Sequence, residues 1–235
     1  MSSESTNTMS AASEKFSGLW CVGCVRTAKG ALHYPMSWRD FDTDTRWTQK
    51  LLWQMGLQRG DFVHLTQSYS ETGQYGPIYN ALRDLGIVYA NGMSTPFDAY
   101  RMEMYLRRFR LAAVFGIASA TLDGLEQAGH DLERLYGGAD RLIARPDAAP
   151  RLRTMGLDVS TVYMVGPILA LEMTPGEGAR FDNREWQVEA IDGELCVTAT
   201  PQRAVDFDKL PTGLKGHVEK VKTQLGPELR IFVHD

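Results

Sequence analysis

Strand-type and helix-type segments alternate through the middle of the chain, and this alternation constrains the fold more than any other feature. Short apolar segments typical of strands lie at 61–67, 87–90, 112–117, 141–144 and 160–164. Between them, apolar side chains recur at helical spacing at 76–85, 96–108, 119–128 and 148–155. Helices of this length serve as crossovers between parallel strands. We therefore predict an α/β fold, a mostly parallel sheet with crossover helices.

The pattern changes near the C-terminus, where an antiparallel hairpin is expected. Segments 185–191 and 194–200 are joined by Asp192-Gly193, a dipeptide that strongly favours a two-residue hairpin turn. Residues 230–234 have the composition of one more strand. The prediction is thus a C-terminal antiparallel β-hairpin attached to the parallel sheet.

An N-terminal helix is expected to begin after Ser37 and to end at Gly56, because serine is a favoured N-cap and glycine a favoured terminator. Its apolar side chains fall at helical spacing: Trp38, Phe41, Trp47, Leu51, Leu52 and Met55. Residues 1–15 are rich in Ser, Thr and Glu and lack apolar periodicity. We expect them to form a disordered tail and residues 16–235 to form a single domain.

Charge and cysteine content restrict the partners and the compartment. The 235-residue chain has a formal net charge of −4, whereas proteins that bind nucleic acid present basic surfaces. Its longest apolar run is about half as long as a bilayer span requires. Cys21, Cys24 and Cys196 form an odd set without a secretory signal, which favours a reducing compartment. We expect a soluble, cytoplasmic protein that binds neither nucleic acid nor membrane.

Metal, redox and hydrolase chemistry each have weak support. Cys21 and Cys24 form a Cys-x-x-Cys pair, but a metal site needs two further ligands, and no other residues show ligand spacing. Buried or incidental thiols are the favoured interpretation over a redox pair. His64 lies in an apolar strand close to Ser68 and no Gly-x-Ser-x-Gly motif occurs, so a structural histidine is favoured. Phosphate-loop and dinucleotide-binding glycine motifs are absent from the sequence.

Two segments are harder to explain as scaffold. Residues 67–76 follow an expected strand and open an expected helix, at the sheet edge where parallel α/β proteins bind ligands. They bring aromatic rings, hydroxyls, a carboxylate and glycines to one place. A ligand pocket with an aromatic wall and an ordinary polar loop are equally compatible with this segment. Residues 163–168 form an apolar turn, for which a buried connection is favoured.

The order of these segments resembles the adenylate-forming acyl-CoA ligase superfamily, in particular its phenylacetate-CoA ligase-like branch. The resemblance rests on GLQRGDFVHLTQSYSETGQYGPIYNALRDLGIVYANG, RRFRLAAVFGIASATLDGLEQAG, DGELCVTA and LPTGLKG, in that order. It runs from about residue 19 to residue 216 and implies part of the large domain of these enzymes. It also implies an AMP-forming carboxylate-CoA ligase with ATP or AMP, Mg²⁺, and CoA or acyl-CoA as ligands.

The resemblance also implies site residues. The acyl-substrate pocket would contain Ser68, Tyr69, Thr72, Gly73 and Tyr75. Residues 21–30 would correspond to the family's phosphate loop, and the remnant of the nucleotide site would comprise Gly23, Thr27, Lys29, Tyr163 and Thr212. The family's metal-binding acid is missing after Tyr163, and Leu214 stands where the family has its ribose-binding aspartate. No protein metal site is expected, and no catalytic residue is assigned.

Three functions remain open. The first is a divergent, truncated ligase homologue without the small C-terminal domain, which binds an aromatic or acyl carboxylate or its CoA thioester with weak or partner-dependent activity. The second is a non-catalytic binding or regulatory subunit. The third is a nucleotide-independent enzyme for an activated acyl compound, using Cys24 or His64. Surface left uncovered by missing subdomains predicts a homo-oligomer or a hetero-partner.

Overall fold

The computed structural model describes residues 18–27, 30–223 and 226–234. The strands are β1 (Leu19–Thr27), β2 (Gly30–Ser37), β3 (Phe62–Gln67), β4 (Val88–Met93), β5 (Ala113–Ile117), β6 (Leu142–Ala144), β7 (Val159–Val165), β8 (Ile168–Glu172), β9 (Ala179–Arg180), β10 (Trp186–Ile191), β11 (Glu194–Ala199), β12 (Leu210–Thr223) and β13 (Gly226–Val233). The helices are α2 (Trp38–Gln54), α3 (Thr72–Leu85), α4 (Ala99–Arg108), α5 (Ser119–Gln127), α6 (Leu132–Tyr136) and α7 (Ala149–Thr154), with 3-10 turns η1 (Tyr69–Glu71) and η2 (Pro96–Asp98). The expected tail, residues 1–15, lies outside the described residues.

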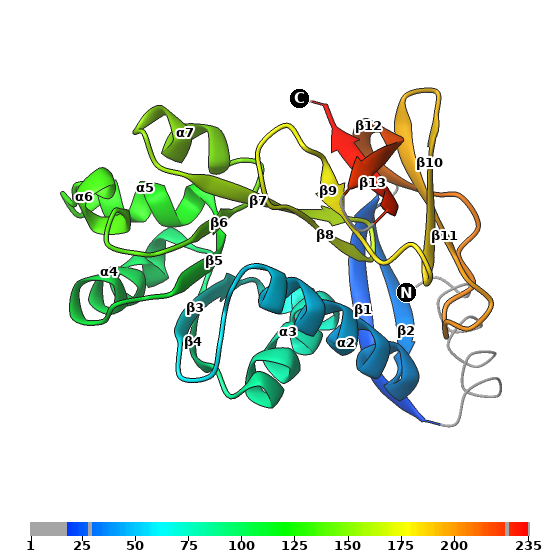
Figure 1. The fold of residues 1–235 in the computed structure, drawn as a ribbon, viewed down its shortest axis with the longest axis horizontal. Helices are drawn as coiled ribbons and strands as arrows, with labels where there is room; N and C mark the ends of the chain where they lie inside the picture. The colour runs from blue at the N-terminus through cyan, green and yellow to red at the C-terminus, as the bar shows by residue number, and fades with distance from the viewer. Residues whose placement is uncertain (1–17, 28–29, 224–225, 235) are drawn as a thin grey trace.

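Most of these strands form one large sheet (Figure 1), in the order β10-β11-β12-β13-β9-β8-β7-β6-β5-β3-β4, and β1 and β2 form a separate hairpin. Strands β7, β6, β5, β3 and β4 are mutually parallel, as predicted. The chain moves outward from β3 to β4 and then returns to the other side of β3 to form β5. The point at which the order reverses therefore lies between β3 and β5.

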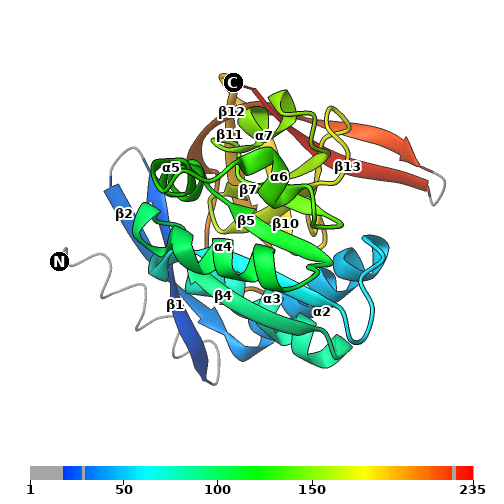
Figure 2. The same ribbon diagram turned by 90° about the vertical axis from the view of Figure 1, so that its left-hand side faces the viewer.

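Helices cover both faces of the parallel strands. Helices α2 and α3 pack on the face that carries Leu65 and Phe115. Helices α4 to α7 pack on the opposite face, against Val114 and Leu142, and α4, α5 and α6 lie in front of the sheet in Figure 2. The helical layer changes face where the strand order reverses, because crossovers between parallel strands are right-handed. The predicted α/β class with crossover helices is confirmed.

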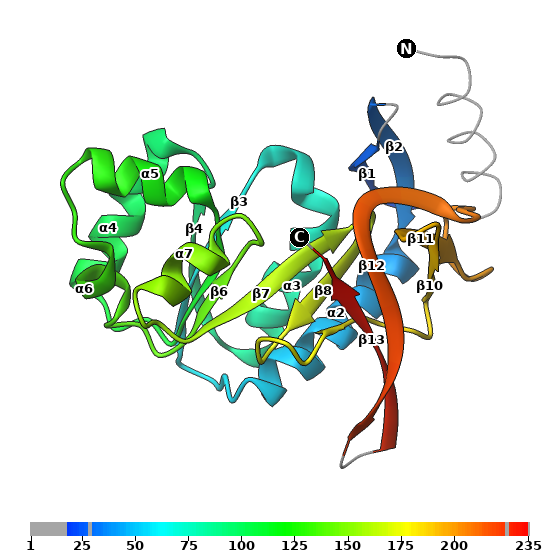
Figure 3. The same cartoon turned by 90° about the horizontal axis from the view of Figure 1, so that it is seen from above.

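The remaining strands of the sheet pair antiparallel. The expected hairpin is β10–β11, and its turn places Asp192 and Gly193 at φ values of 51° and 81°, as a primed turn requires. Strand β12 pairs first with β11 and then with β13, and the β12–β13 hairpin projects from the rest of the molecule in Figure 3. The β1–β2 hairpin packs on this half through a cluster that includes Tyr34, Val165 and Trp186.

The two helices nearest the candidate site differ in how well the sequence predicts them. Helix α2 begins after Ser37, whose backbone N–H and hydroxyl both donate to Asp40 Oδ2 at 2.9 Å. Helix α3 begins at Thr72 rather than at the predicted residue 76. Two glycines and Pro77 lie in its first half, a composition that disfavours an isolated helix. Packing against β1 outweighs that preference.

None of the described helices is both long enough and apolar enough to cross a bilayer.

Candidate functional site

The candidate site lies at the carboxyl edge of the parallel strands, around the point where strand order reverses. In open α/β sheets this edge forms the usual binding crevice, because the two neighbouring connections leave on opposite faces. Ser68 follows β3, Ser119 follows β5 and Arg145 follows β6. The sheet thus brings residues from three separate parts of the chain to one edge.

A hollow with a cavity volume of about 260 Å³ opens where β3 and β4 end. Its lining residues are Gln67, Ser68, Tyr69, Asn91, Gly92, Met93, Phe97, Asp98, Tyr100 and Arg101. We call this site the aromatic hollow. Three of its rings are largely free of protein contacts: Tyr69 is 81% exposed, Phe97 is 88% exposed and Tyr100 is 62% exposed. Exposed aromatic rings around a concave surface are typical of ligand sites rather than of scaffold.

Local hydrogen bonds hold the wall of the aromatic hollow that follows β4. The Thr95 hydroxyl accepts from the Asp98 backbone N–H at 3.4 Å, and Pro96 starts the η2 turn that carries Phe97. Asp98 is buried, accepts from the Met93 backbone N–H at 2.7 Å and pairs with Arg101 at 3.0 Å. Arg101 therefore places a guanidinium group in the wall of the aromatic hollow.

Two polar groups below this wall lack partners. His64 is fully buried, and neither ring nitrogen has a hydrogen-bond partner among the described residues. Burial lowers the pKa of His64 to about 4, against the opposing effect of the Asp98 carboxylate, so the ring is neutral at pH 7. A Cβ atom at Gly92 would lie 3.1 Å from Asp98 Oδ2 and 3.4 Å from His64 Cε1. Gln67 Oε1 is likewise buried and unpartnered within the described chain.

Beside the aromatic hollow, Arg145 and Glu71 form a bidentate ion pair. Arg145 Nη1 donates to Glu71 Oε1 at 2.5 Å and Nη2 donates to Oε2 at 2.7 Å. The Ser68 backbone N–H donates to the same carboxylate at 2.7 Å. Burial would raise the pKa of Glu71, but hydrogen bonds from Arg145 and its charge outweigh burial and lower it. Both side chains are only partly buried, with 18% of Arg145 and 15% of Glu71 exposed.

The five expected acyl-pocket residues do not all lie in one pocket. Ser68 and Tyr69 line the aromatic hollow, and Thr72 lies beside it, where its hydroxyl donates to the Tyr69 carbonyl at 3.0 Å. Gly73 is buried against β1 and β2. Tyr75 is fully buried in the core beneath the sheet, with its ring 6.0 Å from that of Phe115. Its hydroxyl lies 3.5 Å from Arg145 Nη2.

In the expected phosphate-loop segment, residues 21–30, residues 21–27 lie in β1 and pair antiparallel with β2, which begins at Gly30. Gly23 lies in this strand, and Thr27 ends it with its hydroxyl 3.0 Å from the Gly30 carbonyl. Lys29 lies outside the described residues. The resemblance implied a phosphate loop over this segment. Pairing with β2 makes residues 21–27 extended instead, which corrects the expectation for these residues.

The other two nucleotide-site candidates also lie in strands. Burial raises the pKa of Tyr163 to about 12, and its hydroxyl lies 3.5 Å from Glu172 Oε2. Thr212 is buried, and its hydroxyl donates to the Leu195 carbonyl at 2.8 Å. Gly166, in the turn after Tyr163, approaches Thr212 so closely that a Cβ atom would lie 3.3 Å from Thr212 Cγ2. The fold therefore brings this turn and Thr212 together.

Metal and thiol chemistry gain little from the geometry. No group of three metal-ligating side chains occurs among the described residues. The Met-Val-Gly-Pro turn after Tyr163 contains no carboxylate, so these residues do not fit the Mg²⁺ site that the resemblance implies.

Cys21 and Cys24 are both free thiols. Burial raises the pKa of Cys21 to about 11, and its sulfur contacts Met36 Sδ at 3.7 Å. A protonated thiol in such surroundings is a weak nucleophile.

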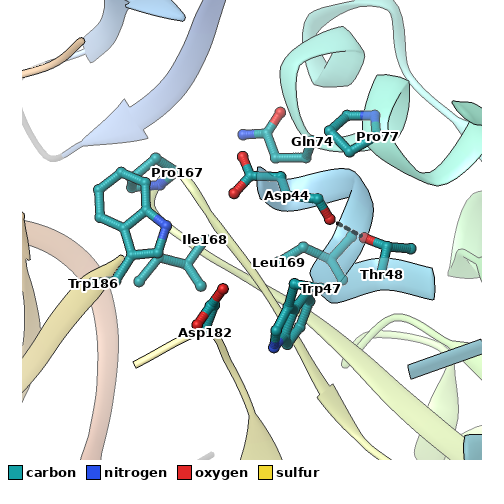
Figure 4. Close-up of a pocket in the computed structure, with 10 residues that line it drawn as sticks. All are labelled: Asp44, Trp47, Thr48, Gln74, Pro77, Pro167, Ile168, Leu169, Asp182 and Trp186. Carbon is teal, nitrogen blue, oxygen red and sulfur yellow. Dashed lines mark hydrogen bonds between the residues drawn. The ribbon is translucent and has the colours of Figure 1, made fainter. Parts of the chain in front are cut away.

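A second, much smaller cavity of about 30 Å³ separates α2 and α3 from the β7–β8 turn (Figure 4). Asp44, Asp182, Gln74 and Trp186 are among the residues around it. This volume holds a water molecule or two. Behind it Arg203, 2% exposed, donates to both oxygens of Asp44 at 2.9 and 2.8 Å. The surrounding charges are already paired, so this cavity is a structural feature.

Sequence reasoning missed one wall of the aromatic hollow and the Arg145–Glu71 pair. Phe97, Tyr100 and Arg101 follow the strand 87–90, which ends at the same sheet edge as 61–67. This segment therefore lies at the same ligand-binding edge as residues 67–76. For Arg145, the signal was a charged residue directly after an apolar strand.

Comparison with solved structures assigns the architecture. An open conformation of 2-hydroxyisobutyryl-CoA ligase in complex with 2-HIB-AMP and CoA matches 92% of this chain and 56% of its own, with a TM-score of 0.68 and 16% identity. The fold is that of part of an acyl-CoA ligase. An ATP-bound RpMatB-BxBclM chimera matches 92% of this chain and 48% of its own (TM-score 0.60, 12% identity). The o-succinylbenzoate CoA synthetase MenE from Bacillus subtilis matches 93% and 50% (TM-score 0.59, 10% identity).

This chain spans about half the length of these acyl-CoA ligase structures. No protein-family model and no curated protein matches its sequence. The architecture is therefore shared with part of these acyl-CoA ligase structures, whereas membership of the adenylate-forming superfamily and of its phenylacetate-CoA ligase-like branch stays a prediction.

Proposed function

We propose that this chain binds an aromatic or acyl carboxylate, or its CoA thioester, in the aromatic hollow. The observation that carries the proposal is the position of this hollow, at the carboxyl edge of β3 and β4 in an acyl-CoA ligase fold. The matched structures include complexes with an acyl adenylate and with CoA. Small-molecule acyl ligands of this kind are the class that the architecture favours.

The size and chemistry of the hollow support that ligand class. A cavity of about 150 Å³ holds benzene, so the 260 Å³ of this hollow accommodates one ring or a short acyl chain together with a polar end. Tyr69, Phe97 and Tyr100 offer the faces and edges on which a flat apolar group packs. Arg101 pairs with Asp98 through Nε, but its side chain is 44% exposed, so the other guanidinium nitrogens offer the cation for a carboxylate.

Adenylation has less support than binding. The resemblance requires a phosphate loop and a metal-binding acid, whereas residues 21–27 form a strand and the turn after Tyr163 lacks a carboxylate. Preorganised charges supply much of the transition-state stabilisation in phosphoryl-group chemistry. We therefore propose that any AMP-forming ligase activity is weak or depends on a partner that supplies the missing charges.

Isothermal titration calorimetry of the full chain tests the proposal. The ligands are phenylacetate, CoA and phenylacetyl-CoA, each with and without ATP and Mg²⁺. We expect binding of the acid or the thioester without nucleotide. Phe97→Ala should weaken that binding about tenfold or more, because an aromatic contact is lost. Its ring is 88% exposed, so the variant should fold normally.

Trp53→Ala is the matched control, since Trp53 is 72% exposed on α2 and does not line the hollow. It should bind as the wild type does. Equal affinity in the Phe97→Ala variant would place the ligand elsewhere, and binding of none of these ligands would overturn the proposal.

A further inference from the structure

Arg145 lies in an arrangement typical of an anion receptor, and the protein's own Glu71 occupies it. Three donors converge on the Glu71 carboxylate: two guanidinium nitrogens of Arg145 and the Ser68 backbone N–H, at 2.5 to 2.7 Å. A planar guanidinium that binds both oxygens of a carboxylate is equally suited to a phosphate. The hydroxyls of Ser68 and Ser70 lie 2.9 Å apart on the same turn.

The receptor half of this pair is held in place without Glu71. Arg145 Nε donates to the Gly116 carbonyl at 3.2 Å, and the Arg145 backbone N–H donates to the Ile117 carbonyl at 2.8 Å. Both acceptors belong to β5, so the guanidinium is anchored to the centre of the sheet. Its charge does not depend on Glu71 either, because a guanidinium stays protonated in proteins at neutral pH.

Glu71 lies on a less firmly anchored element than Arg145 does. It ends η1, a single 3-10 turn between β3 and α3, and its neighbours Tyr69 and Ser70 are exposed. Rotation of this one turn would withdraw the carboxylate without breaking any strand pairing. The partial exposure of both side chains gives a solvent-borne anion a route to the guanidinium.

We propose that Arg145 binds an oxyanion, a carboxylate or phosphate group of a ligand, and that Glu71 acts as an internal competitor which this group displaces. The pair lies at the reversal of strand order, where an α/β sheet offers its crevice. Displacement of Glu71 would move the turn that also carries Tyr69, a wall of the aromatic hollow. The proposal does not depend on what the aromatic hollow binds.

Titration calorimetry with acetate and with inorganic phosphate tests the proposal on the full chain. The wild type should bind at least one of the two anions weakly, because the receptor is competent only in the fraction of molecules whose Glu71 has moved away. Glu71→Ala should bind it about tenfold more tightly or better, because the competitor is gone. Arg145→Met should bind neither anion. Glu71→Gln is a second variant that retains the side-chain volume, and it should change affinity in the same direction.

Asp140→Ala is the matched control, because it removes one acid from an exposed ion pair, that of Arg110 and Asp140. It changes the net charge as Glu71→Ala does and should leave anion affinity at the wild-type value. Acetate and phosphate arms distinguish a carboxylate ligand from a phosphate ligand. Equal anion affinity in Glu71→Ala and wild type, undiminished affinity in Arg145→Met, or no binding of either anion to the wild type would each overturn the proposal.

The Phe97→Ala substitution separates the two proposals. Added to Glu71→Ala, it should leave the anion affinity unchanged, because Phe97 lies in η2 after β4, whereas Glu71 ends η1 after β3 and Arg145 follows β6. If Phe97→Ala abolishes phenylacetate binding and leaves anion binding intact, the two ligands bind at separate sites, and phenylacetate binds in the aromatic hollow.

Discussion

Gly23 in β1 and Gly73 at the start of α3 lie against each other. A Cβ atom on Gly73 would lie 3.3 Å from Gly23 Cα and 2.8 Å from Met36 Sδ. A Cβ atom on Gly23 would lie 2.3 Å from Cζ of Tyr34, which is 1% exposed. The resemblance assigned these two glycines to different ligand sites, but in this structure both allow β1 and α3 to pack around one buried ring.

Gly23→Ala should destabilise the protein, because the methyl group has no space beside the Tyr34 ring. Overpacking of this kind costs about 1–3 kcal/mol. Urea denaturation would measure the change in the free energy of unfolding. Gly138→Ala is the control, since no atom lies within 4 Å of the added methyl group. A Gly23→Ala protein as stable as this control would contradict the tight packing.

Stability should fall with acid between pH 6.5 and 4 because of His64. The pKa of His64 is about 4 in the folded chain, below its ordinary value of 6.5, because burial disfavours the charged ring. The unfolded chain therefore binds a proton in this range before the folded chain does, so the stability present above pH 6.5 is lost on acidification. A shift of this size corresponds to about 3 kcal/mol at the acid end.

His64→Leu tests this prediction, because it removes the titrating ring and keeps the site apolar. Its unfolding free energy, from denaturation series at several pH values, should decline less between pH 6.5 and 4 than that of the wild type. His33→Asn, at an exposed position of β2, should retain the wild-type pH dependence. An unchanged decline in His64→Leu would show that other groups cause the acid sensitivity.

Arg203→Met should be among the most destabilising substitutions in the chain. Arg203 pairs with Asp44, lies 3.7 Å from Asp40 and stacks 4.2 Å from the centre of the Trp186 ring. Its removal leaves the Asp44 carboxylate without its counter-ion, and loss of one partner of a buried pair costs about 3–5 kcal/mol. Arg110→Met removes an arginine that is 82% exposed and should cost less than about 1 kcal/mol. Similar melting temperatures for the two variants would contradict the prediction.

The β10–β11 turn should respond differently at its two positions. Gly193→Ala places a side chain at a φ of 81° and should lower stability by about 1 kcal/mol. Asp192→Gly should be close to neutral, because glycine adopts the φ of 51° at position 192 without strain. Thermal unfolding of both variants checks the contrast, and an equal loss in both would argue against a primed turn.

Much of the fold was predictable because its signals are local. Each parallel strand is a short apolar segment, Ser37 caps α2 through residues close to it in sequence, and Asp192-Gly193 specifies its own turn. Such features need no distant partner. The α/β class and the position of one candidate loop, residues 67–76, therefore followed from the sequence.

The features that the sequence did not reveal depend on distant residues. Helix α3 starts at Thr72 because β1 packs on its glycines, and residues 21–27 are extended because β2 pairs with them. Arg145 meets Glu71 from 74 residues away, and the aromatic hollow needs walls from two different strand ends. Local propensity and periodicity determined by themselves which segments become strands or helices. The tertiary structure decided which side chains share a site, because only sheet order and packing bring them within contact distance.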